Sequence, residues 1–147
     1  MTKHKNFNGT YEESLNDWAL REMQANEFIS VLSKLFYEKS IELVFYRSQL
    51  IDRSASIILY RHSYAENIIH KPLKVIDSLN LAKAILHCGV GPSKLDIGRL
   101  NREWTEEQKN YVDFEDFIKI KLKHLIGTKR SFDQPVDVIL YGFGRIG

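Results

Sequence analysis

The sequence predicts an all-α fold, a bundle of about five helices that is followed by one β-strand and a glycine-rich turn. Three observations lead to this prediction. Residues 10–127 repeat apolar side chains at helical spacing, with glycine and proline confined to a few places. A short apolar run at 136–141 has the composition of a buried strand, and the last six residues contain three glycines.

The composition is that of one ordinary globular domain. The chain has 147 residues, of which 44% are hydrophobic and 27% are charged. A net charge of +2, with both signs interspersed, favours neither a nucleic acid partner nor a membrane surface. The single cysteine excludes an internal disulfide, and no apolar run is long enough to span a bilayer. We therefore expect a cytoplasmic protein without a membrane partner.

The first two helices are expected to form an antiparallel pair. Thr10 and Glu13 fit a capping box, so the first helix should begin there and leave 1–9 as a flexible tail. Its apolar face would carry Ala25, Ile29, Leu32 and Phe36. The second helix is expected at 40–67, where apolar side chains recur every seventh residue, at Leu43, Leu50, Ile57 and Tyr64.

A third helix is expected after an interruption at Pro72. The segment 73–76 is expected to be extended, Asp77 would cap the helix, and Gly89 would end it. Its inward face would carry Leu79, Ala82, Ile85 and Leu86.

Two further helices complete the predicted bundle. The turn Gly91-Pro92-Ser93 precedes Asp96, which is expected to cap a short helix that runs through Trp104. The last helix should begin at Asp113 and end at Gly127. Its inward face would carry Phe114, Phe117, Ile118, Leu122 and Leu125.

The character of the chain changes after Gly127. Residues 128–135 form a polar connector, which we interpret as a linker, and 136–141 form the expected strand. The predicted organisation is thus a tail at 1–9, a helical domain at 10–127, a linker at 128–135 and the start of a second domain at 136–147.

The residues after the strand carry a motif with a chemical meaning. Gly142-Phe143-Gly144-Arg145-Ile146-Gly147 has the G-x-G-x-x-G spacing of the dinucleotide fingerprint. The first glycine permits a tight turn, the second lets the backbone approach a pyrophosphate, and the third lets helix and strand pack closely. This motif predicts the start of a truncated Rossmann-type domain that binds NAD or NADP.

The same residues resemble a known family. Gly-Phe-Gly-Arg-Ile-Gly after a strand is similar to the opening signature of glyceraldehyde-3-phosphate dehydrogenase. The helical region resembles the N-terminal extension of a long form of that enzyme, from about Tyr37 onward. The resemblance rests on segments 45–56, 71–73, 81–84 and 92–98. Tyr141 stands where the usual short enzyme has asparagine, which also resembles the long form.

The resemblance implies that this chain is the N-terminal, structural or assembly part of a longer glycolytic oxidoreductase. The parent enzyme would pass hydride from an aldehyde to NAD or NADP. Gly142, Phe143, Gly144, Arg145, Ile146 and Gly147 would contact that cofactor. The implied partners are the remainder of the dehydrogenase chain and further copies in a homo-oligomer. We expect no catalytic residue in 1–147, no activity of this part alone and no cofactor bound to it.

Other candidate sites are weaker. Cys88 lies just before Gly89 at a predicted helix end, outside any motif that would mark it as a nucleophile, and is interpreted as a structural thiol. The five histidines lack metal-ligand spacing, so we expect no metal site. Basic and aromatic side chains gather between residues 46 and 64. They are Tyr46, Arg47, Arg53, Tyr60, Arg61, His62 and Tyr64. Structural roles are favoured for them, but they also support an alternative function.

In that alternative, the helices form an autonomous regulatory module for a protein, anion or RNA partner. A third interpretation treats the glycine motif as accidental and the chain as a complete helical protein. The apolar strand would then have no sheet to join, so we expect it to be disordered or paired with another copy.

Overall fold

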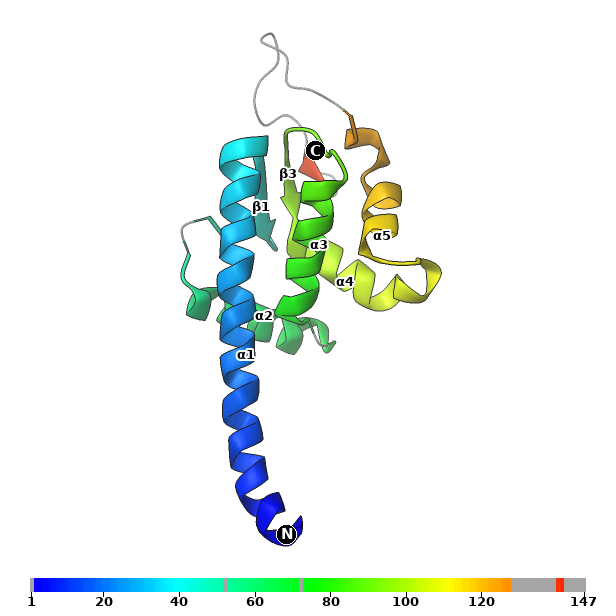
Figure 1. Ribbon diagram of the computed structural model, residues 1–147. Helices are drawn as coiled ribbons and strands as arrows, with labels where there is room; N and C mark the ends of the chain where they lie inside the picture. Colours follow the sequence, from blue (N-terminus) through cyan, green and yellow to red (C-terminus); the bar gives the residue numbers. More distant parts are fainter. Residues whose placement is uncertain (1, 52, 72, 128–139, 142–147) are drawn as a thin grey trace.

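The computed structural model describes residues 2–51, 53–71, 73–127 and 140–141. It is mostly helical, with five α-helices among these residues (Figure 1). They are α1 (Thr2–Lys39), α2 (Ala55–Ile69), α3 (Val75–His87), α4 (Ile97–Glu107) and α5 (Phe114–Lys121), with single 3₁₀ turns at Gln108–Asn110 and Lys123–Leu125. The predicted helical class and the number of helices are confirmed.

A small mixed sheet is added to the helices. Its strands are β1 (Ile41–Phe45), β2 (Ser48–Gln49), β3 (Ser93–Asp96) and β4 (Leu140–Tyr141), in the spatial order β2-β1-β3-β4. β2 returns antiparallel to β1, whereas β1, β3 and β4 are parallel. Because β1 and β3 are joined through α2 and α3, this part of the chain is a βαβ crossover. The sequence pattern did not indicate it.

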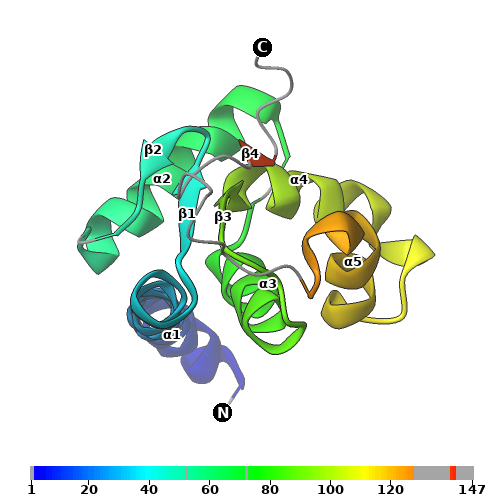
Figure 2. The ribbon, with the colours of Figure 1, turned by 90° about the horizontal axis from the view of Figure 1, so that it is seen from above.

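The helices enclose this sheet (Figure 2). In that view α1 and α3 lie on one side of the strands, and α2 and α4 lie on the other. α1 packs most extensively against α3, and the two helices run in the same direction in Figure 1. The expected antiparallel pairing of the first two helices is therefore wrong, since the main helical neighbour of α1 is the third helix.

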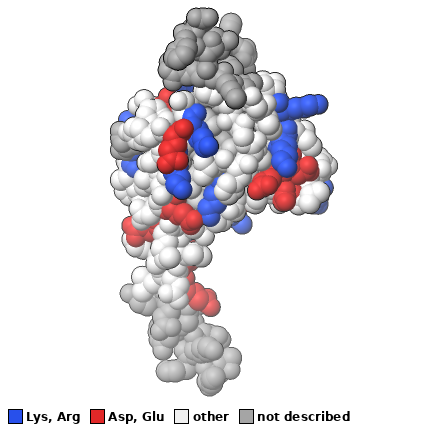
Figure 3. Space-filling model, turned by 45° about the horizontal axis from the view of Figure 1, so that its top comes forward, with Lys and Arg blue, Asp and Glu red and all other residues white. Residues whose placement is uncertain are grey.

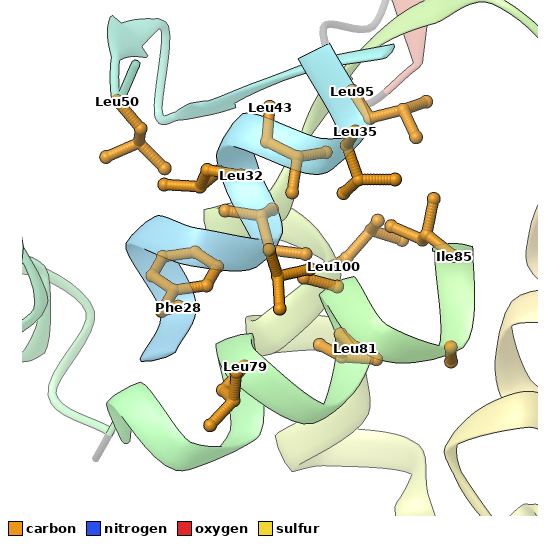
Figure 4. Packing of buried hydrophobic residues seen from close by; sticks show 14 of the residues in the cluster. Phe28, Leu32, Leu35, Leu43, Leu50, Leu79, Leu81, Ile85, Leu95 and Leu100 are labelled. Atoms are coloured by element: carbon orange, nitrogen blue, oxygen red, sulfur yellow. The ribbon is translucent and has the colours of Figure 1, made fainter. Parts of the chain in front are cut away.

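One continuous core joins α1, β1, α3, β3 and α4 (Figure 4). Phe28, Leu35, Leu43, Leu81 and Leu100 are each at most 2% exposed. These side chains come from helical and strand segments far apart in the sequence, so their burial holds the crossover together.

The expected second helix at 40–67 is replaced by a hairpin, a loop and α2. α1 ends at Lys39, and Ser40 has a φ of 59°, a left-handed conformation that stops a helix. Ile41–Phe45 then forms β1, whose side chains are buried except at Glu42. An apolar run of this length can be a buried strand as well as a helix, which is why the sequence pattern predicted a helix here.

The inward face of α2 also differs from the expected one. Its buried residues are Ile58, His62 and Ala65, whereas Ile57 is 39% exposed and Tyr64 is 56% exposed. The seven-residue recurrence therefore runs through a strand, a loop and a helix and does not mark one helical face.

Helix starts were predicted with mixed success. Asp96 and Asp113 cap α4 and α5 as expected, each accepting backbone hydrogen bonds. α1 begins at Thr2 rather than Thr10, so helical backbone includes most of the segment expected to be a tail. α3 begins at Val75, so Asp77 lies in the first turn and is not the predicted cap. The end of the segment 73–76, which was expected to be extended, is therefore helical. Pro72 lies outside the described residues.

Gly89 follows the end of α3 as predicted, whereas the predicted end of the last helix at Gly127 is wrong, because α5 ends at Lys121. Gly89 has a φ of 74° just after α3, and Gly127 has a φ of 82° after the turn that follows α5. Both adopt the left-handed conformation that glycine tolerates best. The inward residues predicted for α5 are confirmed, because Phe117, Ile118, Leu122 and Leu125 are buried and Phe114 packs against the core.

Candidate functional site

The strand that leads into the glycine motif joins the sheet of the same chain. β4 pairs in parallel with β3, with Leu140 opposite Lys94 and Tyr141 opposite Leu95. The expectation that this strand would be disordered or paired with another copy is therefore wrong for Leu140–Tyr141. The six predicted cofactor residues, Gly142–Gly147, lie outside the described residues, as does the linker at 128–135.

The carboxyl ends of β1 and β3 meet at one edge of the sheet, where Asp96 organises the backbone. Asp96 Oδ1 accepts hydrogen bonds from the backbone N–H groups of Tyr46 (2.8 Å), Gly98 (3.1 Å) and Arg99 (3.2 Å). Burial raises the pKa of this fully buried carboxyl, and those backbone donors oppose the rise. The start of α4 is therefore capped by the chain itself and is not an open anion site.

The hairpin between β1 and β2 is unusual because neither residue of its turn is glycine. Tyr46 and Arg47 have φ values of 48° and 74°, both in the left-handed region. Two-residue hairpins require such angles, yet ordinary side chains adopt them at a cost of about 1–3 kcal/mol each. The hydrogen bond from Tyr46 N to Asp96 helps to hold this turn against the start of α4.

The Tyr46 ring packs directly on α4. A Cβ atom at Gly98 would lie 2.8 Å from Tyr46 Cδ2, so only glycine lets the ring and the helix come this close. Burial raises the pKa of the Tyr46 hydroxyl, while the positive charges of Arg102 and Arg99 oppose the rise. The hydroxyl thus lies in a partly buried, polar setting along α4.

A pocket of about 420 Å³ lies on the other side of this hairpin, between it and α2. Its lining residues are Phe45, Tyr46, Ser48, Tyr60, Arg61, Tyr64, Ala65, Ile68 and Ile69. The rings of Tyr60 and Tyr64 are stacked, with centroids 6.1 Å apart and planes 24° apart. Among the described residues, the buried Tyr46 hydroxyl and Arg61 Nε have no hydrogen-bond partner. We call this the tyrosine pocket.

A second cavity of about 700 Å³ lies between α1, α2 and the start of α3. Its lining includes Trp18 and Arg21 of α1, Tyr60 and Glu66 of α2, and Lys74. It is more polar than the tyrosine pocket and more distant from the carboxyl ends of the strands.

A buried polar network lies behind this cavity. His62 Nδ1 lies 2.8 Å from the carbonyl of Ile58, and His62 Nε2 lies 2.7 Å from Ser78 Oγ. Because a carbonyl only accepts, Nδ1 carries the proton and Nε2 accepts from the serine hydroxyl. Asn101 Nδ2 in turn donates to Ser78 Oγ at 2.8 Å and to the carbonyl of Lys74 at 3.0 Å.

This serine and histidine have the hydrogen bond of a nucleophile and its base, but Ser78 has no exposed surface. Burial lowers the pKa of His62 to about 4, so the ring is neutral at neutral pH. We interpret the network as part of the core that aligns α2, α3 and α4.

The structure separates the basic and aromatic residues that the sequence grouped together. Tyr46, Tyr60, Arg61 and Tyr64 meet at the tyrosine pocket, although Tyr46 is on a hairpin and not on the helix that carries the others. Arg47 belongs to the hairpin turn, Arg53 is exposed in the loop before α2, and His62 faces the core.

Sequence reasoning missed Arg99, Arg102, Ser78 and Asn101. Their neighbours come from other segments of the chain, so no local spacing could have indicated them.

The remaining sequence predictions concern a thiol, metals and membranes. Burial raises the pKa of the Cys88 thiol and nearby Glu115 adds to the rise, which disfavours the reactive thiolate. Within the described residues, no three histidine, cysteine, aspartate or glutamate side chains converge in a way that would hold a metal ion. No helix in the described part of the chain has the length and apolar character needed to cross a membrane.

Charges of both signs lie next to each other on the face shown in Figure 3. Ion pairs among the described residues include that of Lys121 Nζ, which lies 3.1 Å from Glu103 Oε1 and 3.0 Å from Glu107 Oε1. Pairs of this kind leave no broad field of one sign on that face, which argues against a charged polymer as its partner.

A comparison with known proteins finds a distant relative. No family model matches the chain. The chain is similar to a "Glyceraldehyde-3-phosphate dehydrogenase-like protein" of Pseudomonas aeruginosa (strain UCBPP-PA14), with 29% identity over 123 residues. The match covers 81% of this chain and 26% of that protein. The chain thus spans about a quarter of the length of the curated relative it matches.

Proposed function

We propose that this chain is the N-terminal, non-catalytic part of a glyceraldehyde-3-phosphate dehydrogenase-like oxidoreductase that uses NAD or NADP, and that it serves in structure or assembly. The observation that carries the proposal is the similarity over 81% of this chain to a quarter of a protein of that name. The G-x-G-x-x-G motif, which follows directly after β4, supports a dinucleotide site in the longer enzyme.

The chemistry of the described residues supports a non-catalytic role. Among them, the one serine that is hydrogen-bonded to a histidine, Ser78, is fully buried, and no substrate carbonyl can reach it without opening the core. The pKa of the Cys88 thiol is raised by burial and further by nearby Glu115, which disfavours the reactive thiolate. In this proposal, hydride transfer belongs to the part of the enzyme beyond residue 147.

The exposed part of α1 supports an assembly role. Its N-terminal half extends away from the rest of the protein (Figure 1). Leu15 and Trp18 are 50% and 55% exposed, and Leu20 and Met23 are 50% and 67% exposed. At 100° per residue these two pairs lie on different sides of the helix. A helix that is apolar on more than one side usually packs against further protein.

The test compares the longer enzyme with and without residues 1–127. Formation of reduced nicotinamide from glyceraldehyde 3-phosphate, with phosphate present, measures activity, and light scattering measures the mass of the oligomer. The proposal expects turnover by the full-length enzyme and a smaller oligomer, or an unstable one, after deletion. Turnover with identical mass and activity in both forms would remove the structural role. Absence of turnover from a folded, cofactor-bound enzyme would remove the catalytic assignment.

A pair of point variants tests the same role without deleting a domain. Leu20→Asp combined with Met23→Asp places charges on one exposed side of α1, and should shift the enzyme to a smaller oligomer. Ser14→Asp, in an exposed position on the other side of α1, is the control and should leave the mass unchanged.

The alternative function is a helical module that binds a regulatory partner. The convergence of Tyr46, Tyr60, Arg61 and Tyr64 on one pocket favours a small ligand for such a module over a long polymer. Simultaneous substitution of Arg47, Arg53 and Arg61 should abolish capture of an anionic or RNA partner if this alternative holds.

A further inference from the structure

The tyrosine pocket is an apolar hollow with exposed side chains around it. Its volume is about 420 Å³, and its described lining residues are aliphatic or aromatic except Ser48 and Arg61. Tyr60, Tyr64 and Ile68, which line it from α2, are 63%, 56% and 59% exposed. Large apolar side chains that gather around a surface hollow usually mark a contact with another protein. The lining therefore suits an apolar side chain of a partner.

α2 carries an apolar stripe that runs along the pocket and beyond it. The exposed large apolar side chains of α2 are Ile57, Tyr60, Tyr64 and Ile68. At 100° per residue these four side chains fall within about 80° of arc. The buried side chains of α2 lie on a different side, so the rest of the protein covers one apolar face and leaves the other exposed. A second apolar face of this kind is typical of a helix that packs on another helix.

Residues 15–23 of α1, which we call the arm, offer apolar side chains to such a surface. The arm extends beyond the body of the protein at the end where α2 lies (Figure 1). Leu15 and Met23 are 50% and 67% exposed, and they lie about 80° apart around the helix. Met23 lies on the opposite side of α1 from the buried Leu32, so it points away from the core of its own chain. It is therefore available to a second molecule, and its flexible thioether can fill an irregular hollow.

The charges of the pocket and of the arm are complementary. Arg61 is the charged member among the described lining residues of the pocket, and it is positive. Of the four charged residues at 13–22 of α1, three are acidic, and Arg21 is paired with Asp17 at 3.0 Å. Glu22, which directly precedes Met23, would approach Arg61 when Met23 enters the pocket. Opposite charges at the edge of an apolar contact favour encounter and fix its orientation.

The exposed area favours a second copy of this chain as the partner. A docked arm covers two large side chains of its own and four of α2, and these are Leu15, Met23, Ile57, Tyr60, Tyr64 and Ile68. At roughly 100 Å² lost for each half-exposed side chain, one docked arm buries about 600 Å² in total, the size of a non-specific contact. Two arms exchanged between two copies bury about 1,200 Å², which reaches the range of specific interfaces.

We infer that two copies of this chain exchange arms, so that Met23 of each copy enters the tyrosine pocket of the other and Glu22 lies near Arg61. This inference rests on the assembly role proposed above, and it names the surface that receives α1. The contact is reciprocal, as a two-fold axis requires. Because its area lies at the lower end of the specific range, we expect a dissociation constant on the order of tens of micromolar.

Disulfide trapping tests which surfaces meet. Two variants of residues 1–147 are made in a Cys88→Ser background, one with Met23→Cys and the other with Tyr64→Cys. Their mixture should form a disulfide-linked dimer under mild oxidation, whereas each variant alone should form little. Tyr37→Cys replaces Tyr64→Cys in the matched control, because Tyr37 is also exposed on α1 but lies away from the pocket, and its mixture with Met23→Cys should stay unlinked.

Sedimentation equilibrium measures the strength of the contact. The unmodified chain should show a monomer–dimer equilibrium, and Met23→Asp or Tyr64→Asp should each weaken it at least about tenfold, because a charge is then placed in an apolar contact. Tyr37→Asp should leave the dimer unchanged. Glu22→Arg and Arg61→Glu should each weaken the dimer, and a mixture of these two variants should associate more strongly than either alone. Circular dichroism confirms that each variant is folded.

The outcomes that would overturn the inference are specific. A chain that stays monomeric up to about 200 μM, or a dimer that Met23→Asp and Tyr64→Asp leave intact, would overturn it. Trapping of Tyr64→Cys alone would replace it with a contact between two α2 helices, and trapping of Met23→Cys alone with a contact between two arms. Each of these results could occur while deletion of 1–127 still shrinks the longer enzyme's oligomer. In that case the proposed assembly role would stand without this contact.

Discussion

The two halves of α1 belong to one helix but have opposite surroundings. From Ala25 to Leu35 the inward side chains are at most 7% exposed, and they pack against the sheet and α3. Between Leu15 and Met23 four large apolar side chains are each at least 50% exposed. The difference shows that the apolar content of a helix does not decide what it contacts, because only the C-terminal half has a sheet beside it.

This contrast also divides the helix by role. The C-terminal half supplies the free energy that holds the βαβ crossover, whereas the N-terminal half, from Leu15 to Met23, leaves four large apolar side chains at least 50% exposed, and these contribute little to it in this chain alone. Its exposed side chains acquire a role only if further protein covers them, as the proposed assembly requires. The following substitutions and conditions test the contrast, from the largest expected effect to the smallest.

The largest effect is expected at Phe28, in the buried half. Phe28→Ala removes a ring that has no exposed surface and that packs edge-on against His62, with centroids 6.3 Å apart. The cavity should lower the free energy of unfolding by about 3–5 kcal/mol. Urea denaturation followed by circular dichroism measures this, and a loss under 1 kcal/mol would show that the buried half is not part of the core.

Acid should destabilise the core around the buried half of α1 through His62 of α2, which packs against Phe28. Its folded pKa of about 4 lies below the ordinary value of 6.5, so the unfolded chain binds the proton more tightly. The contribution of the neutral His62 ring to the free energy of unfolding is fully present above pH 6.5, declines as the pH falls, and is lost near pH 4. The total loss should be about 3 kcal/mol. Urea titrations at several pH values measure the decline.

The control for the pH series is His62→Gln, which removes the titrating ring and keeps polar atoms. Because other groups titrate in both proteins, the difference between them isolates His62. A difference that does not change between pH 7 and pH 4 would contradict the lowered pKa.

A smaller effect is expected at Ser78. Ser78→Ala leaves His62 Nε2 without its donor and removes an acceptor for Asn101, both in the core. The loss should be about 1–3 kcal/mol. Ser63→Ala, in an exposed position of α2, serves as the matched control in the same urea assay.

The smallest effect is expected in the exposed half of α1. Met23→Ala alters a side chain that is 67% exposed and should change the free energy of unfolding of this chain by less than about 0.5 kcal/mol. A loss above 1 kcal/mol in the isolated chain would mean that this half already packs within the monomer, and the contrast would fail.

Several features were predictable because they depend on neighbouring residues. The caps at Asp96 and Asp113 are recognisable from the polar residue before an apolar helix, and the end of α3 is recognisable from Gly89 after it. β4 was expected within 136–141 for a similar reason, since a short apolar run before a glycine turn is typical of a buried strand.

The sheet and the tyrosine pocket were not predictable in the same way. Ser93–Asp96 has no strand-like composition and becomes β3 only because β1 lies beside it. Tyr46 reaches the pocket because the hairpin after β1 folds towards α2, whereas a continuous helix at 40–67 would have placed it on the same rod as Tyr64.

The sequence by itself determined that the chain is mostly helical, where several helices begin and end, and that a glycine motif follows a strand, because these follow from side chains a few residues apart. Only the tertiary structure decided that β1, β3 and β4 run parallel in one sheet, that His62, Ser78 and Asn101 meet in the core, and that the large apolar side chains between Leu15 and Met23 of α1 stay exposed. Those outcomes depend on contacts between distant segments, whose free energy is gained only when the whole chain packs.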